Sequence, residues 1–170
     1  MDLKTYVRDI PDWPKEGVMF RDITPLLGNK ESFKYAIDSI ADHYKDKNID
    51  IVLGAEARGF ILASALAYRL GCGFVPARKP GKLPYNTLSA EYELEYGVDS
   101  LEMHEDAIKP SERVLVVDDV IATGGTAAAK VKLVEQLGGT IVGVAFLIEL
   151  SFLNGRSKLE GQDVFSLITY

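Results

Sequence analysis

A run of thirteen residues, VLVVDDVIATGGT at 114–126, constrains the fold of this chain more than any other segment. It begins with four apolar residues, three of them β-branched, which is typical of a strand buried on both faces of a parallel sheet. Two aspartates follow, then a turn rich in glycine and threonine, then alanines that favour a helix. This order predicts an α/β fold with polar residues gathered at the carboxyl ends of parallel strands.

Helical and strand patterns alternate along the rest of the chain. Apolar periodicity predicts helices over 30–45, 59–70 and 127–137, and short apolar runs predict strands over 51–54, 74–77, 114–117 and 140–148. The 170 residues contain no repeat or linker. We therefore expect one domain over 1–170, with a central, mostly parallel sheet flanked by helices.

The polar, proline-punctuated stretch 78–97 is too long for a simple connection and is predicted to be a mobile functional loop. Within it, glutamates alternate with tyrosine and leucine over 85–96, a pattern that fits a β-ribbon with one acidic face. Such a ribbon could close over a site as a lid.

The turn Ala122-Thr123-Gly124-Gly125-Thr126 has the features of a site for one phosphate. Its glycines let the backbone approach an anion, its threonines add hydroxyl donors, and the start of the next helix offers free N–H groups. Asp118 and Asp119 precede it and could accept hydrogen bonds from the 2′- and 3′-hydroxyls of a ribose 5-phosphate. The segment therefore predicts a sugar-phosphate pocket.

Other classes of protein share parts of this motif. A nucleotide-binding P-loop would need a lysine after its glycines, and no G-x-G-x-x-G sequence occurs in the chain. A phosphorelay receiver can end a strand in two aspartates, but that strand comes first in its domain, whereas only the last 51 residues follow Asp119 here. A turn whose aspartates only cap a helix is the structural alternative.

Composition excludes several further classes. The single cysteine, Cys72, allows no internal disulfide and no cysteine-rich zinc site, and His43 and His104 have no partner at metal-ligand spacing. A net charge of −6 argues against a broad nucleic-acid surface. With no apolar N-terminal leader and no membrane-length apolar run, the chain is expected to be cytoplasmic and to bind no membrane.

Two further segments could bind a second anion. Arg58 stands between a predicted strand and a predicted helix, at the same sheet edge as the phosphate turn. The cations Arg78, Lys79 and Lys82 follow the next strand, between prolines, and form a candidate anion clamp. The alternative for Arg58 is an exposed arginine at a helix start, and a basic triplet taken alone is more often a solvated loop.

The strand, acidic pair and ATGGT turn resemble the phosphoribosyl pyrophosphate (PRPP) motif of type I phosphoribosyltransferases. Further segments extend the resemblance, in order and along the whole chain, to the branch of that family that acts on adenine: VMFRDITPLL at 18–27, GAEARGF at 54–60, RKPGKLP at 78–84, EYGVDSLEMH at 95–104 and FLIEL at 146–150. The resemblance implies transfer of the phosphoribosyl group of PRPP to adenine, giving AMP and pyrophosphate, with Mg²⁺ and in a homodimer. It also implies a hood from about 1–28 and 149–170 and a lid over 78–103.

The resemblance also assigns roles to individual residues. Asp118 and Asp119 would bind the ribose diol and would contact magnesium only through its water ligands. The 5-phosphate would be bound by Ala122, Thr123, Gly124, Gly125 and Thr126. Pyrophosphate would be bound by Glu56, Ala57, Arg58, Arg78 and Lys79. Arg78 would act in the site of its own subunit or in that of the partner subunit. Adenine would be bound by the backbone at Val18, Phe20 and Arg21 and by the side chain of Leu150. The resemblance gives Glu95, Tyr96 and Arg58 as the catalytic residues.

Two details of the resemblance concern the pyrophosphate loop. Family members join the residues at positions 56 and 57 by a non-proline cis peptide, which is therefore expected between Glu56 and Ala57. They usually have serine at position 57, so alanine keeps the backbone donor and loses a hydroxyl contact. Two alternatives share the fold: an enzyme acting on xanthine or another base, and a non-catalytic regulator that senses PRPP or a purine.

Overall fold

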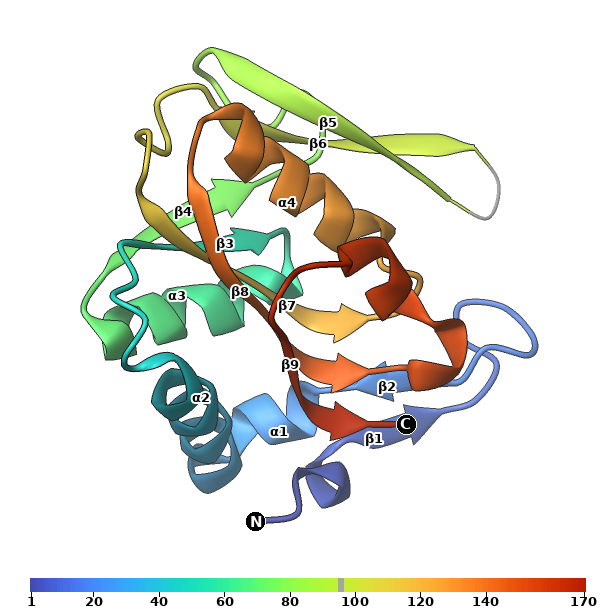
Figure 1. Ribbon diagram of the computed structural model, residues 1–170. Helices are drawn as coiled ribbons and strands as arrows, with labels where there is room; N and C mark the ends of the chain where they lie inside the picture. The colour runs from blue at the N-terminus through green and yellow to red at the C-terminus, as the bar shows by residue number, and fades with distance from the viewer. Residues whose placement is uncertain (95–96) are drawn as a thin grey trace.

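The computed structural model describes residues 1–94 and 97–170 and has a five-stranded sheet at its centre (Figure 1). The strand order is β4–β3–β7–β8–β9, and every neighbouring pair is parallel. The strands are β3 (Ile51–Ala55), β4 (Gly73–Ala77), β7 (Arg113–Ile121), β8 (Thr140–Glu149) and β9 (Val164–Thr169). The predicted parallel α/β fold is confirmed.

The central strand β7 is apolar without alternation because both of its faces are covered. Leu115 and Val117 pack in one core cluster with residues of α2 (Lys30–Tyr44) and α3 (Arg58–Leu70). Val114 and Val116 point the other way and pack with α4 (Gly125–Gln136). The sheet therefore lies between two helical layers, as Figure 1 shows.

Three helix ends carry residues that are typical of such positions. Asn29 caps α2, since its side chain accepts hydrogen bonds from the backbone N–H groups of Glu31 and Ser32. The short helix α1 (Thr24–Gly28) has Pro25 in its first turn, and α3 ends at Gly71, whose φ of +70° is left-handed. Within the described residues, every helix is too short or too polar to span a lipid bilayer.

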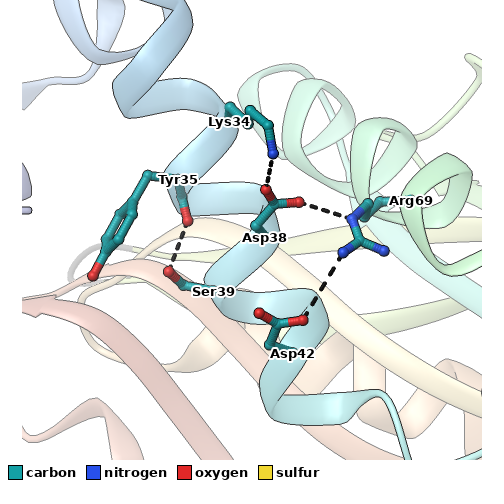
Figure 2. A network of polar contacts seen from close by, with 6 residues as sticks. All are labelled: Lys34, Tyr35, Asp38, Ser39, Asp42 and Arg69. Atoms are coloured by element: carbon teal, nitrogen blue, oxygen red, sulfur yellow. Dashed lines mark hydrogen bonds and ion pairs between the residues drawn. The ribbon is translucent and has the colours of Figure 1, made fainter.

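A polar network joins the outer surfaces of α2 and α3 (Figure 2). Asp38 of α2 accepts a 2.8 Å hydrogen bond from Nε of Arg69 on α3 and a second bond from Lys34. Arg69 also lies 3.9 Å from Asp42. Hydrogen bonds from Lys34 and Arg69 lower the pKa of Asp38. These contacts are solvent-exposed, so they are expected to contribute little to stability.

Two small antiparallel units lie outside the central sheet. One pairs β1 (Arg8–Ile10) with β2 (Phe20–Asp22) beside the 3₁₀ helix η1 (Leu3–Tyr6). The other pairs β5 (Thr87–Glu93) with β6 (Val98–His104), and its residues Ala90, Leu101 and Met103 are buried in the core cluster of α4. The ribbon predicted in the 85–96 region is therefore present, and over its described residues it is regular and packed on α4.

The C-terminal segment contributes the last strand of the central sheet. After β8 the chain forms two 3₁₀ helices, η2 (Ser151–Leu153) and η3 (Gly155–Leu159), and then β9. β9 pairs in parallel with β8 as the edge strand of the central sheet, and most of its residues are half-buried there. The division of the chain into a core and a hood over about 1–28 and 149–170 stays a prediction.

Candidate active site

A cleft of about 420 Å³ opens at the carboxyl ends of β3 and β7, and residues of β2 and of the β5–β6 ribbon also line it. Parallel strands place their ligands at this edge, and the volume suits a small-molecule ligand. Most of the predicted site residues line this cleft: Val18, Phe20, Arg21, Glu56, Ala57, Arg58, Lys79, Asp118, Asp119, Ala122, Thr126 and Leu150. Tyr92 and Leu101 of the ribbon also line it.

A smaller cavity of about 90 Å³ adjoins this cleft and is lined by the whole turn from Ala122 to Thr126. Gly124 precedes α4 with a left-handed φ of +82°, and no side chain caps the helix. The N–H groups of the first turn of α4 are therefore not satisfied by a side-chain cap, which is the arrangement that binds an anion.

The first residue of η3, Gly155, packs against the backbone of this turn. A Cβ atom on Gly124 would lie 2.2 Å from the carbonyl oxygen of Gly155, and a Cβ atom on Gly155 would lie 2.4 Å from the carbonyl oxygen of Ala122. The two backbones touch only because both residues are glycine. Gly155 was not among the predicted site residues, and nothing local in its sequence distinguishes it from a glycine in an ordinary turn.

The two aspartates at the end of β7 are buried, and each is paired with a cation. Oδ2 of Asp118 lies 2.6 Å from Nζ of Lys130, and Oδ1 accepts the backbone N–H of Asp119 at 3.0 Å. Oδ2 of Asp119 forms an ion pair with Arg58, whose Nε lies 2.9 Å away. Among the described residues, this oxygen has no hydrogen-bond donor of suitable geometry. Burial, together with the neighbouring charge of Asp118, raises the pKa of Asp119 to about 7.

Lys130 is a site residue that the sequence analysis missed. Its side chain is completely buried, although it was read only as part of a helix-forming run. A signal was present, because Lys130 falls on the core-facing side of α4 with Ala127, Val131 and Val134. A charged residue at a core-facing helix position needs a buried partner, and the adjacent aspartates supply it.

The loop after β3 contains the expected non-proline cis peptide between Glu56 and Ala57, and α3 begins immediately afterwards at Arg58. Oε1 of Glu56 accepts the backbone N–H of Lys79 at 2.8 Å and lies 3.3 Å from Nε of Arg78. The carboxylate therefore holds the basic pair that follows β4. Arg78 does not line the cleft.

Lys79 is held by the β5–β6 ribbon. Its Nζ donates to the hydroxyl of Tyr92 at 2.7 Å and forms a short ion pair with Asp99. Tyr92 and Asp99 were not predicted as site residues, because their contact with Lys79 depends on how the ribbon packs. The remaining ribbon residues of the prediction, Glu95 and Tyr96, lie outside the described residues.

The hood residues form an apolar and aromatic wall of the cleft. The ring of Phe20 packs edge-on against Trp13 at 4.3 Å, and the guanidinium of Arg58 lies 5.1 Å from the Phe20 ring centroid. Arg21 turns its side chain away from the cleft, to an ion pair with Asp9 and to a position 3.8 Å above the ring of Tyr170. A ligand between Phe20 and Leu150 would therefore meet the backbone of Arg21 and not its charge.

The raised pKa of Asp119 predicts a change of stability with pH. The folded protein keeps this proton up to about pH 7, while the unfolded chain releases it near pH 4. The contribution of Asp119 to the free energy of unfolding therefore falls as the pH rises between these values, by on the order of 2 kcal/mol from pH 5 to pH 8. Urea unfolding of the wild type and Asp119→Asn at both pH values measures it. The same pH dependence in both proteins would contradict the raised pKa.

Comparison with known proteins gives consistent matches over the whole chain. A family model described as the phosphoribosyl transferase domain matches residues 23–165. The adenine phosphoribosyltransferase of Brachyspira hyodysenteriae is 61% identical over all 170 residues of this chain and all of its own, and that of Thermotoga maritima is 59% identical over all of this chain and 98% of its own.

Solved structures agree with the sequence matches. The adenine phosphoribosyltransferase of Thermoanaerobacter pseudethanolicus is 54% identical, with a TM-score of 0.97 over 99% of this chain and 98% of its own. The Saccharomyces cerevisiae enzyme, solved with adenine and an imino-altritol bisphosphate, is 44% identical, with a TM-score of 0.93 over 97% of this chain and 96% of its own. This chain belongs to the phosphoribosyltransferase family and, within it, to the adenine phosphoribosyltransferases.

Proposed function

We propose that this protein transfers the 5-phosphoribosyl group of PRPP to N9 of adenine, giving AMP and pyrophosphate in purine salvage. The observation that carries the proposal is one cleft that joins a buried carboxylate pair, a glycine turn at a helix start, and the cations Arg58 and Lys79. A ribose with a phosphate at one end and a pyrophosphate at the other matches these groups in order. The Trypanosoma brucei relative, 28% identical, was solved with AMP, pyrophosphate and ribose-5-phosphate, which supports the same ligands here.

Each group of the substrate is assigned to one part of the cleft. Asp118 and Asp119 accept hydrogen bonds from the ribose 2′- and 3′-hydroxyls, and the 122–126 turn donates to the 5-phosphate. Arg58 and Lys79 bind the pyrophosphate, with the backbone N–H of Ala57. Glu56 acts by orienting Lys79 and Arg78, since a carboxylate facing pyrophosphate would repel it.

Magnesium is proposed as the cofactor, carried by the substrate. Within residues 1–94 and 97–170, no group of three or more histidine, cysteine, aspartate or glutamate side chains is arranged to hold a metal ion. Asp118 and Asp119 are instead paired with Lys130 and Arg58. These residues fit an ion coordinated mainly by pyrophosphate and ribose oxygens, with the aspartates reaching it through its water ligands. Bound there, magnesium would neutralise charge on the leaving group.

Transfer breaks the bond between C1 of the ribose and the pyrophosphate oxygen, whose electron pair leaves with pyrophosphate, and forms the bond between N9 of adenine and C1. Positive charge develops on C1 and the ring oxygen while negative charge grows on the leaving group. Arg58 and Lys79 stabilise that anion. Glu95 is proposed to accept the proton that N9 loses, and Tyr96 to close the cleft against water.

Adenine is proposed to lie between Phe20 and Leu150, against the backbone of 18–21. A backbone carbonyl there accepts a hydrogen bond from the 6-amino group, whereas the 6-oxo group of hypoxanthine or guanine would face it lone pair to lone pair. The mismatched base would leave a buried acceptor unpaired. Base choice therefore follows from backbone geometry and not from the charge of Arg21.

Pyrophosphate release from PRPP and Mg²⁺, with adenine, hypoxanthine, guanine and xanthine offered separately, tests this proposal. We expect release with adenine to be at least about tenfold faster than with any 6-oxopurine, because of the unpaired carbonyl. Faster release with xanthine would favour an enzyme of the same fold for another base. Tight PRPP binding without turnover of any base would indicate the non-catalytic regulator.

We further propose that the protein works as a cytoplasmic homodimer. Tyr68 and Phe152 are 91% and 71% exposed, and large aromatic side chains of this kind are enriched at subunit interfaces. With a net charge of −6, we expect no nucleic-acid partner.

A further inference from the structure

Lys130 is a fully buried cation on a helix face that otherwise carries apolar residues. It lies between Ala127 and Val134 on the side of α4 that faces the sheet, and none of its side chain is exposed. Removing a lysine from water is unfavourable, and an apolar residue of similar size would pack at such a position at least as well. The fold alone therefore does not explain this lysine.

The contacts of Lys130 all lie at the end of β7. Its Nζ donates to Oδ2 of Asp118 at 2.6 Å and to the backbone carbonyl of Val117 at 3.1 Å. The ammonium group thus links the carboxylate to the strand from which it projects. The pair is deep enough that water hardly screens it.

The carboxylate of Asp118 is held on its other sides as well. Oδ1 accepts the backbone N–H of Asp119 at 3.0 Å. On the side of α3, the carboxylate packs directly against the backbone of Gly59. A Cβ atom on Gly59 would lie 2.5 Å from Oδ1, so only glycine at position 59 leaves space for the carboxylate. Both oxygens are therefore fixed in one orientation, and each has a further lone pair for a ligand.

Asp118 lines both the main cleft and the smaller cavity of the 122–126 turn. It therefore stands where a ribose joins its 5-phosphate, and a small rotation of its carboxylate would change its distance to a ribose hydroxyl. We infer that Lys130 is a positioning residue for ribose recognition: it holds the carboxylate of Asp118 oriented toward the sugar diol. The inference rests on the proposed function only in that the ligand is a ribose 5-phosphate.

Calorimetry with sugar phosphates tests this inference on the full-length protein. The probes are ribose 5-phosphate, its 2-deoxy and 3-deoxy analogues, and pyrophosphate with Mg²⁺. We expect Lys130→Met to weaken ribose 5-phosphate binding about tenfold or more, as for the loss of one charge-assisted hydrogen bond in a buried site. The preference for ribose over at least one deoxy sugar should shrink, while pyrophosphate binding changes less than about threefold.

A matched control and a double variant separate positioning from general damage. Lys132 is two residues along the same helix and exposed, so Lys132→Met should bind all four probes as the wild type does. In an Asp118→Asn background, Lys130→Met should cause little further loss, because the group through which it acts is already changed. Lys130→Gln replaces Lys130→Met if the latter fails to fold.

Equal losses for ribose and both deoxy sugars, or full additivity with Asp118→Asn, would overturn the inference. Failure of the proposed function is distinguishable: the wild type would then bind ribose 5-phosphate but release no pyrophosphate with adenine. The ribose preference and its dependence on Lys130 would stand in that case.

Discussion

Replacing Gly155 with alanine is expected to lower kcat/KM for PRPP by about 100-fold or more, although Gly155 touches no substrate group. Its added Cβ would lie 2.4 Å from the carbonyl oxygen of Ala122 and 3.1 Å from the backbone nitrogen of Gly124. Neither neighbour is a flexible side chain, so the backbone of the phosphate turn must move. A displacement of about 1 Å at a binding group can cost about 100-fold in rate.

Initial rates of AMP formation at varied PRPP measure this effect, and most of it should appear as a raised KM for PRPP. Gly28→Ala is the matched control, because no atom lies within 4 Å of its Cβ position and its φ is not positive. Thermal unfolding should show Gly155→Ala folded and destabilised by about 1–3 kcal/mol, the usual result of overpacking. A wild-type KM in Gly155→Ala would show that the turn does not depend on its contact with the start of η3.

The contact between Gly155 and the turn illustrates what sequence patterns do not contain. The strand over 114–117 was predictable because a strand buried on both faces has a continuous apolar run. The turn at 122–126 was predictable because glycines directly before a helix are typical of an anion site at the helix N-terminus. The packing of residue 155 against residue 124 depends on the path of the chain between β8 and β9. No periodicity encodes that path.

The sheet itself was predictable except for one of its two edge strands. The strands β3, β4, β7 and β8 read as short apolar runs, but β9 at 164–169 includes a serine and a threonine and is mostly half-buried. Its parallel crossover from β8 passes through two 3₁₀ helices instead of an α-helix. The usual alternation of strand and helix that signals a parallel neighbour is therefore missing.

Within the site, residues at strand ends were predictable and their partners were not. Arg58 follows β3, and the two aspartates lie near the carboxyl end of the extended strand β7, so all three reach the sheet edge where the carboxyl ends of parallel strands meet. Lys130 and Tyr92 reach the same place from a helix and a ribbon, through packing that local sequence does not specify. Charge at a core-facing helix position was the only local sign of Lys130.

Replacing Arg58 with methionine is expected to lower kcat/KM for PRPP about 1000-fold, the upper range for loss of one preorganised group that stabilises transition-state charge. Methionine keeps much of the apolar stem and removes the guanidinium, which lies 2.9 Å from Oδ2 of Asp119 and 5.1 Å from the ring centroid of Phe20. Arg58 thus lies against the carboxylate proposed to bind the ribose diol and near the ring proposed to line the base pocket, and it is proposed to bind the leaving pyrophosphate. Its loss should lower kcat as well as PRPP affinity, because the pyrophosphate gains charge only during transfer.

Single-turnover rates with PRPP and adenine, together with pyrophosphate binding by calorimetry, separate the two effects. Arg69→Met is the matched control on the same helix, since Arg69 contacts Asp38 and Asp42 on the outer surface of α2 (Figure 2). It should leave both measurements unchanged. If Arg58→Met reduced binding of PRPP but left the single-turnover rate intact, Arg58 would be a ground-state binding residue, and stabilisation of the leaving group would fall to Lys79 and the helix start at α3.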